Sequence, residues 1–506
     1  MPKTIKKIAI VGGGTAGWLT AAILAAHHRN HQISGVEITL IESSDIPTIG
    51  VGEGTWPTMK NTLQQIGLKE SDVFKTCNAT FKQGGKFVDW VHGNGDFYYH
   101  PFTVPLGYGR IDLAPYVSNI KDYAPEANFQ HAICEAGLAP RGMAEGEYQG
   151  RCNYAYHLDA GAFAEMLKQH CKTKLNVNHL IATVDSADQD ELGNISRLRL
   201  GNAADFKADL FIDCSGLAAL LIGKTLKVPF IKQDKVLFND RALAMQVPYD
   251  NDQSPIASHT IATAQNAGWI WDIGLTHRRG VGHVYSSQYL SDEQAERNLR
   301  QYIGPAADGL MVKKICFESG HRERFWQNNC VAVGMAAGFV EPLEATAIML
   351  VEMSARFIAE NLPVNQQVMA VTATRFNQQM DYRWRRIIDF LKLHYMLTQR
   401  KEPYWQAHCE ADSIPQTLKD DLAMWAFRGP TINDFNGPIE LFPAASYQYV
   451  LYGMEFKPDF TQQAHLYQQH ARAQPILSQN QQLTQQMLNN LPPHRDYITR
   501  WLASTN

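Results

Sequence analysis

Three glycines near the start of the chain have the spacing at which a backbone turn can hold a pyrophosphate. Gly12, Gly14 and Gly17 fit the pattern G-x-G-x-x-G. In this pattern the first glycine allows a tight turn, the second lets the pyrophosphate approach the backbone, and the third lets a helix pack close to a strand. The N-terminus of that helix attracts the phosphate charge. The alternative interpretation is a glycine-rich turn that binds no ligand.

The segments around these glycines predict the β-α-β unit that the pattern requires. Residues 6–11 predict a short buried strand, residues 18–26 are rich in Ala and Leu and predict a helix, and residues 36–41 predict the next strand. That strand ends in Glu42, whose carboxylate is placed to accept hydrogen bonds from the ribose of an adenosine. We therefore predict a dinucleotide-binding site at the start of an α/β fold.

Later segments favour FAD over NAD as the dinucleotide. A second glycine-rich loop, from Gly50 to Gly54, follows Glu42, and a buried strand over residues 209–213 leads into a turn at 214–216. Separate segments that return to one nucleotide suit FAD, which is longer than NAD and needs a site for its isoalloxazine ring. The sequence has no second G-x-G-x-x-G for NADPH. Reduced flavin is therefore expected from elsewhere, or NAD(P)H binds transiently without a domain of its own.

Length and composition indicate a large globular protein. The 506 residues suggest two to three domains. The net charge of −4 lacks the strong basic excess typical of nucleic-acid binding. No apolar run reaches the roughly 20 residues of a membrane span, and no signal peptide precedes the first strand. The eight cysteines form no CxxC pair, so we expect a cytoplasmic protein without a disulfide framework or a structural zinc site.

Five segments, in the same order along the chain, resemble the flavin-dependent tryptophan halogenases and their indole-halogenating relatives. They are residues 12–18 (GGGTAGW), 49–55 (IGVGEGT), 79–82 (ATFK), 268–273 (GWIWDI) and 339–346 (FVEPLEAT). Many flavoproteins share the first motif, whereas the W-x-W signature together with the lysine segment is specific. The chain departs from the family at Gly274, where Pro is usual, and at Ala347, where Gly is common. The first departure favours a looser strand and the second a narrower halide pocket.

The resemblance implies an α/β (α+β) fold with an FAD-binding box of the GR2 or p-hydroxybenzoate hydroxylase type. This box has a Rossmann-type β-α-β start and an antiparallel sheet, which strand patterns over residues 240–330 also predict. We expect the box to comprise residues 1–91 and 151–360 and a mainly helical substrate-side subdomain to comprise residues 361–506. Residues 92–150 have little periodicity and are either an insertion over the active site, as the domain division assumes, or irregular packing.

The resemblance also implies a reaction in two separated stages. A halide is oxidised to hypohalous acid beside reduced FAD and O2, and the acid passes through a tunnel to the substrate. There Lys82 holds it by hydrogen bonds or as a haloamine, while Glu344 activates it and accepts the proton of the aromatic ring. Lys82 and Glu344 are then expected to face each other in a closed chamber. A separate NAD(P)H-dependent flavin reductase supplies FADH2, and a homodimer is plausible by analogy.

Further site residues are implied by the same resemblance. Backbone groups of Thr346 and Ala347 are expected to hold bromide or chloride, and no metal site is expected. Residues of the substrate pocket and tunnel are expected to be His100, Phe102, Trp269, Trp271 and Ile273. Cofactor contacts are expected at Gly12, Gly14, Thr15, Ala16, Gly17, Glu42, Gly50, Val51, Gly52, Gly334 and Met335.

Two other functions remain open from the sequence. The first is an aromatic hydroxylase on the same scaffold, although such enzymes usually carry a late Gly-Asp pair and here Met335 follows Gly334. The second is a flavin-binding protein that has lost catalysis, which the presence of Lys82 and Glu344 disfavours. Without the surrounding motifs, Lys82 would be interpreted as a solvated residue on a strand edge, and the two tryptophans as one strand face packed on a core.

Overall fold

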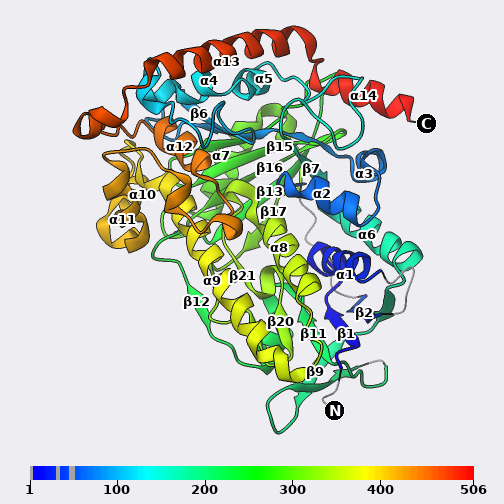
Figure 1. Cartoon of the computed structure of the whole chain (residues 1–506). Helices are drawn as coiled ribbons and strands as arrows, with labels where there is room; N and C mark the ends of the chain where they lie inside the picture. Colours follow the sequence, from blue (N-terminus) through cyan, green and yellow to red (C-terminus); the bar gives the residue numbers. More distant parts are fainter. Residues whose placement is uncertain (1–3, 30–34, 45–51, 202, 506) are drawn as a thin grey trace. The chain divides into compact units, whose positions relative to one another are not determined.

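The chain alternates between two folding units, so that each unit is built from three separate segments. The computed structural model describes residues 4–29, 35–44, 52–201 and 203–505 (Figure 1). The first unit comprises Met1–Ala79, Leu158–Lys232 and Glu318–Trp384, and the second comprises Thr80–His157, Gln233–Phe317 and Arg385–Asn506.

A six-stranded sheet forms the centre of the first unit, with the strand order β19-β20-β11-β1-β2-β8. All neighbouring strands are parallel except β19 and β20. The strands are β1 (Lys7–Val11), β2 (Glu37–Glu42), β8 (Asn178–Ile181), β11 (Leu210–Asp213), β19 (Trp326–Gln327) and β20 (Cys330–Ala332). Helix α1 (Thr15–His27) connects β1 to β2. The predicted β-α-β unit and the strand predicted at 209–213 are confirmed.

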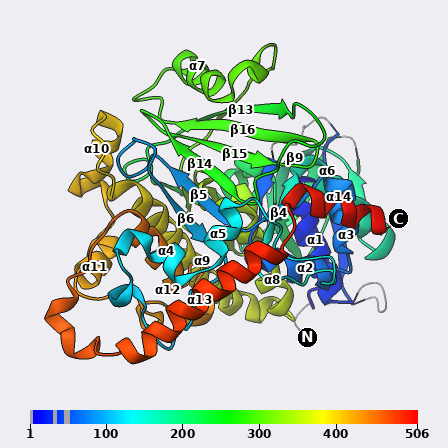
Figure 2. The same ribbon diagram turned by 90° about the horizontal axis from the view of Figure 1, so that it is seen from above.

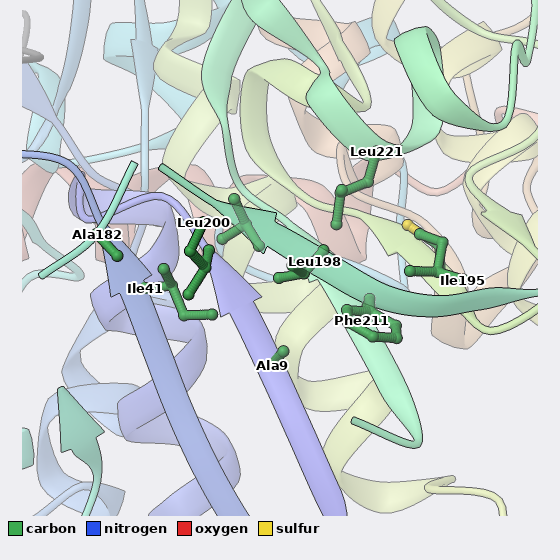
Figure 3. Close-up of a cluster of buried hydrophobic side chains, with 10 residues drawn as sticks. Ala9, Ile41, Ala182, Ile195, Leu198, Leu200, Phe211 and Leu221 are labelled. Carbon is green, nitrogen blue, oxygen red and sulfur yellow. The ribbon is translucent and has the colours of Figure 1, made fainter. Parts of the chain in front are cut away.

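Further helices and strands complete the first unit. They are β3 (Gly52–Gly54), α2 (Thr58–Gln65), α3 (Glu70–Cys77), α6 (Ala160–Lys174), the hairpin of β9 (Val184–Gln189) and β10 (Ile195–Leu200), β12 (Phe230–Lys232), β18 (Gly320–Arg322), β21 (Gly338–Phe339) and α8 (Thr346–Glu360). Asp159 caps α6, since its Oδ1 accepts hydrogen bonds from Gly161 N (3.0 Å) and Ala162 N (3.1 Å). Figure 3 shows the core under the hairpin, where Leu198 packs beside Ala9, Ile41 and Phe211.

A seven-stranded sheet forms the centre of the second unit, with the order β17-β13-β16-β15-β14-β5-β6. Its strands are β5 (Gly84–Val88), β6 (Phe97–Pro101), β13 (Arg241–Pro248), β14 (Thr260–Ala264), β15 (Trp269–Gly274), β16 (Arg278–Tyr285) and β17 (Lys313–Cys316). The sheet is antiparallel apart from the parallel pair β5 and β14. Helix α7 (Asp292–Ile303) covers one face of β13, β15 and β16, where Ile270 and Leu299 belong to one hydrophobic cluster (Figure 2).

A short antiparallel pair and several helices complete the second unit. Strand β4 (Thr80–Lys82) pairs with β7 (Ala155–Asp159). The helices are α4 (Tyr123–Ala127), α5 (Gln130–Glu135), α10 (Pro403–Cys409), α11 (Gln416–Trp425), α12 (Ala444–Gly453), α13 (His470–Asn490) and α14 (His494–Ser504). Helix α9 (Gln366–Met396) contributes to both units. Among the described residues, no helix is long and apolar enough to cross a membrane.

The division into units differs from the expected domain boundaries. Residues 80–91 and 233–317 group with residues 92–157, because β5 and β6 are hydrogen-bonded members of the large sheet. Residues 92–150 therefore contribute a strand and two helices as well as loops. The Gln-rich segment near the end of the chain lies largely in the long helix α13, which begins at His470. The proposed roles of the three expected domains stay predictions.

Candidate active site

In the glycine turn after β1, one of the three glycines of the motif has free space beside its Cα. Gly12 has a φ of 118°, and a Cβ there would lie 2.2 Å from the carbonyl oxygen of Cys214. A Cβ on Gly17 would lie 1.9 Å from the carbonyl oxygen of Gly12, so this glycine allows α1 to pack against the turn. At Gly14, by contrast, a Cβ would meet nothing within 4 Å. These three environments fit the tight turn, close packing and ligand approach of the dinucleotide motif.

Helix α1 begins directly after this turn and carries the other predicted residues of the first loop. Gly14 is the N-cap, no side chain caps the helix, and the first turn holds no acid, so amides near Thr15 remain suited to an anion. Gly334 lies against this helix, since a Cβ there would be 2.8 Å from Cβ of Ala16. Met335 follows it in a 3₁₀ turn. The structure therefore brings the glycine turn and the late turn together within one unit.

Glu42 ends β2 beside the glycine turn and has two partners that the sequence did not reveal. Its Oε1 accepts a hydrogen bond from His179 Nε2 (2.7 Å) and pairs with Lys168 Nζ (3.2 Å). Its Oε2 faces Gly13, where a Cβ would lie 1.5 Å away. Burial lowers the pKa of His179, although the Glu42 carboxylate opposes that shift. The carboxylate is thus oriented at the end of the strand, as ribose recognition requires.

The second glycine loop lies mostly outside the described residues. Gly50 and Val51 belong to the segment 45–51, of which nothing is described, and Gly52 begins β3. Glu53 follows in the same strand, and burial raises the pKa of its carboxyl to about 7.

Lys82 ends β4 with a buried side chain. Only 3% of its surface is exposed, and its Nζ lies 5.2 Å from the centre of the Phe102 ring. The hydroxyl of Thr80, two residues earlier on the same strand, donates to the carbonyl oxygen of Gly274 (2.6 Å) and ties β4 to the end of β15. The solvated edge position that an isolated lysine would favour is therefore not what the fold provides.

A buried histidine near Lys82, His157, is kept uncharged by its environment. His157 lies opposite Thr80 on β7 and is fully buried, with its Nε2 hydrogen-bonded to the hydroxyl of Thr260 (2.8 Å). Burial lowers the pKa of His157 well below its usual value, and the charge of Lys82 lowers it further. His157 is therefore neutral near physiological pH. In the described part of the chain, no three His, Cys, Asp or Glu side chains gather as metal ligands would.

Glu344 occupies an unusual backbone turn at the start of α8. Glu344 has a φ of 66° and Ala345 a φ of 54°, so two consecutive residues other than glycine adopt the left-handed conformation. Such residues are strained and persist only where their surroundings fix them. The indole Nε1 of Trp56, which is 7% exposed, donates to the carbonyl oxygen of Glu344 (2.7 Å). Trp56 thus holds the turn in place, and no sequence motif predicted this contact.

The turn leads into an uncapped helix N-terminus at the predicted halide position. Thr346 begins α8 and is buried, whereas Ala347 is exposed. No side chain caps α8 and its first turn has no acid, so its first amides suit an anion. Helix α8 is also tied to α2, because the buried Glu352 accepts hydrogen bonds from the hydroxyls of Thr58 (3.1 Å) and Thr62 (2.5 Å).

The predicted pocket residues of the second unit lie in two groups. His100, at 2% exposure, hydrogen-bonds through Nε2 to the hydroxyl of Ser446 on α12 (2.8 Å), and Phe102 is the ring beside Lys82. The second group is Trp269, Trp271 and Ile273, which alternate along one face of β15 and are all buried.

The two tryptophans of β15 are held by neighbours within the second unit. Trp269 lies 6.3 Å from Trp90 between ring centres, and the Trp271 ring covers Gly282, where a Cβ would lie 2.1 Å from the indole. Gly274 remains in the strand and pairs with Arg279, so its departure from the family pattern does not release the strand end. A lining role for these residues stays a prediction.

Lys82 belongs to the second unit and Glu344 to the first, and the expected closed chamber between them stays a prediction. Within the first unit, the glycine turn with its neighbouring segments defines a dinucleotide-binding α/β protein.

Comparisons with known proteins identify the family. The chain matches the tryptophan halogenase family over residues 7–470. A solved tryptophan halogenase from Shewanella frigidimarina NCIMB 400 is 44% identical, with a TM-score of 0.93 and coverage of 99% of this chain and 98% of the other. The tryptophan 6-halogenase SttH from Streptomyces toxytricini is 33% identical over 477 residues, which are 88% of this chain and 89% of SttH.

A third relative is described as flavin-dependent. Tar14, a tryptophan C-6 flavin-dependent halogenase (chlorinase) from taromycin biosynthesis, is 32% identical, with a TM-score of 0.91 and coverage of 98% of this chain and 100% of the other. The fold is that of the flavin-dependent halogenases. The chain belongs to the tryptophan halogenase family, and the resemblance drawn from its motifs is confirmed.

Proposed function

We propose that this protein uses FADH2 and O2 to halogenate an electron-rich aromatic compound, either indole, tryptophan or a related molecule. The observation that carries this proposal is the buried amine of Lys82 beside the Phe102 ring, in the segment that resembles the lysine segment of the family. Membership of the tryptophan halogenase family supports the reaction type, and the named relatives act on tryptophan.

The first unit offers the residues to hold FAD. The open backbone at Gly14 and the uncapped start of α1 fit a pyrophosphate, and Glu42 fits the adenosine ribose. Gly334 and Met335, beside α1, fit a position further along the cofactor. When bound, reduced FAD supplies the oxygen chemistry that converts a halide into hypohalous acid.

The amides of Thr346 and Ala347 are proposed to hold the halide, because they begin a helix that has no side-chain cap and no acid within its first turn. The halide is bromide or chloride. We expect bromide to be preferred, because it is easier to oxidise.

Lys82 and Glu344 are proposed to act on the hypohalous acid and the substrate. A lysine ammonium donates hydrogen bonds that orient the acid, and a neutral amine accepts the halogen as a haloamine. The aromatic ring then forms a carbon–halogen bond. When the acid is held by hydrogen bonds, the O–halogen bond breaks and hydroxide leaves. When the acid has first formed a haloamine with loss of water, the N–halogen bond breaks and the lysine amine is released. The carboxylate of Glu344 accepts the ring proton, which restores aromaticity.

The proposal includes a separate NAD(P)H-dependent flavin reductase as a transient partner, because the chain has no second nucleotide fingerprint. A cytoplasmic location and a homodimer are carried over from the sequence as parts of the proposal.

The test is halogenation of indole with FAD, a flavin reductase, NADH, O2 and bromide, followed by mass spectrometry. Lys82→Ala should abolish product while FAD binding, measured by fluorescence, is unchanged. Glu344→Gln should lower the rate by about 10²-fold or more, because a positioned acid or base contributes that much. Lys86→Ala, which removes another lysine of the second unit, one paired with Glu135 (2.5 Å), is the matched control and should retain activity.

Two results would contradict the proposal. Product formed at the full rate by Lys82→Ala would remove the lysine from the reaction. Hydroxylated product made by the protein and NADPH alone, without a reductase or halide, would favour the hydroxylase instead.

A further inference from the structure

A cavity of about 320 Å³ lies entirely within the second unit, next to α12. It is open to solvent on one side and is bordered by the loop around Tyr108, the segment 430–433 and the turn that precedes α13, and Gln448 of α12 forms part of its wall. Its volume falls in the range of small-molecule sites, about 300–1,000 Å³. None of the roles proposed above uses this space.

The cavity and the predicted substrate residue His100 border different faces of α12. Ser446 faces His100, to which it is hydrogen-bonded at 2.8 Å. Gln448 follows two residues later and faces the cavity, where its side chain accepts a hydrogen bond from the hydroxyl of Tyr123 (2.8 Å). Two residues correspond to a rotation of about 200° around a helix, so the two side chains point in nearly opposite directions. The cavity is therefore distinct from the neighbourhood of His100.

Asp112 supplies a carboxylate to the cavity. Its Oδ1 accepts hydrogen bonds from Ala114 N (3.1 Å) and Gln448 Nε2 (3.4 Å). Across the described ranges, no lysine or arginine makes an ion pair with it, and burial raises the pKa of its carboxyl to about 6. The group is still mostly ionised at pH 7.5. A carboxylate that is partly removed from water without a cation beside it favours a ligand that brings one.

The other residues that line the cavity suit a ligand with an apolar centre and charged ends. Four tyrosines, Tyr108, Tyr116, Tyr123 and Tyr467, contribute to the wall. Aromatic rings pack against apolar groups and attract cations through their faces. Arg110 also lines the cavity, and its side chain is exposed. The cavity thus offers a carboxylate, aromatic surface and a guanidinium.

We infer that this cavity is a second ligand site, which binds the zwitterion of an α-amino acid with an apolar side chain. The ammonium group pairs with Asp112, the carboxylate with Arg110, and the side chain packs among the tyrosines. This inference goes beyond the proposed halogenation and does not depend on it, because binding here needs neither flavin nor halide.

The test is calorimetric titration of the full-length protein at pH 7.5 with three related probes. L-phenylalanine carries both charges, phenethylamine only the ammonium, and 3-phenylpropanoate only the carboxylate. We expect L-phenylalanine to bind most tightly and 3-phenylpropanoate most weakly. Asp112→Asn should weaken L-phenylalanine and phenethylamine by about ten-fold or more, as the loss of a charge-assisted hydrogen bond does.

Two further variants decide the assignment. Arg110→Gln changes an exposed residue that is compatible with folding, and it should weaken L-phenylalanine by about two- to five-fold while leaving phenethylamine unchanged. Phe102→Ala alters the ring beside Lys82 and should leave all three affinities unchanged. The inference is overturned if L-phenylalanine does not bind, if Arg110→Gln has no effect on it, or if Phe102→Ala rather than Asp112→Asn removes binding.

Discussion

At the scale of single residues, the glycines of the turn differ in whether a side chain would fit. A Cβ at Gly14 would lie in free space, whereas a Cβ at Gly12 or Gly17 would collide with a backbone oxygen. Its backbone has a φ of −76°, which any residue adopts. The glycine at this position is therefore not required for folding, and the approach of a phosphate gives a reason for it.

Gly14→Ala should leave stability nearly unchanged and weaken FAD binding. The added methyl group meets no protein atom within 4 Å, but it occupies the space that the pyrophosphate needs. We expect the dissociation constant for FAD, followed by flavin fluorescence, to rise by about ten-fold or more. Thermal unfolding without flavin should match the wild type. Gly12→Ala is the contrasting variant and should lower the unfolding temperature, and equal FAD affinity in Gly14→Ala would contradict the assignment.

At this scale the sequence names candidate residues but not their contacts. Its motifs singled out Lys82 and Glu344, because short segments around them resemble a family. The hydrogen bond from Trp56 to Glu344 joins residues 288 positions apart, and no local pattern encodes such a pair. The same holds for His179, which lies 137 positions from Glu42.

At the scale of elements, α2 and α8 are joined through a buried carboxyl group. Glu352 is 1% exposed, accepts hydrogen bonds from Thr58 and Thr62, and lies on the helix whose N-terminus is proposed to hold the halide. Burial raises the pKa of Glu352 to about 7, while hydrogen bonds and Arg356 oppose the shift. The folded protein therefore keeps a proton on this group at pH values where the unfolded chain has lost it.

Because of Glu352, the free energy of unfolding should fall as the pH rises from about 4.5 to about 7. A raised carboxyl pKa stabilises the fold fully below the unfolded value, and this contribution is lost as the pH passes the folded value. The loss amounts to about 3 kcal/mol at most. Glu352→Gln should remove this part of the pH dependence, measured as urea midpoints at pH 5 and pH 8.

Glu360→Gln, at the exposed end of α8, is the control and should keep the wild-type slope. Glu53, whose pKa burial also raises to about 7, contributes to the slope in all three proteins. An unchanged slope in Glu352→Gln would show that the carboxyl group is ionised in the fold.

Elements with strong local signals were predicted well, and those without them were not. The apolar segments at residues 6–11, 36–41 and 209–213 predicted strands of the central sheet of the first unit, and strand patterns over residues 240–330 predicted the antiparallel sheet. Residues 92–150 have little periodicity, and β6 is held there by its pairing with β5 rather than by its own pattern. The two compact units also divide the chain differently from the expected domains, since the long-range pairing of β5 and β6 groups residues 80–91 with the second unit.

For the whole molecule, the exposure of its cysteines follows from how the two units bury their cores. All eight cysteines are free, and only Cys316 is exposed, while Cys409 is partly buried. The remaining thiols are buried, and burial raises the pKa of Cys77, Cys152 and Cys171 to about 12. Buried protonated thiols react slowly with disulfide reagents.

The native protein should therefore show one fast thiol and one slower thiol with a chromogenic disulfide, and eight thiols after unfolding. Cys316→Ser should remove the fast phase without changing the slower one. Several fast thiols in the native protein would mean that the cores open more readily than their packing indicates.

Because Glu344 and Ala345 form one left-handed turn directly before Thr346, the carboxylate proposed to accept the ring proton and the amides proposed to hold the halide share a single short backbone segment. A substitution at position 347 that moves this segment would therefore displace both groups. We expect a change of halide preference at this position to alter deprotonation of the ring as well, and restoring it calls for compensating changes at Trp56, which holds the turn.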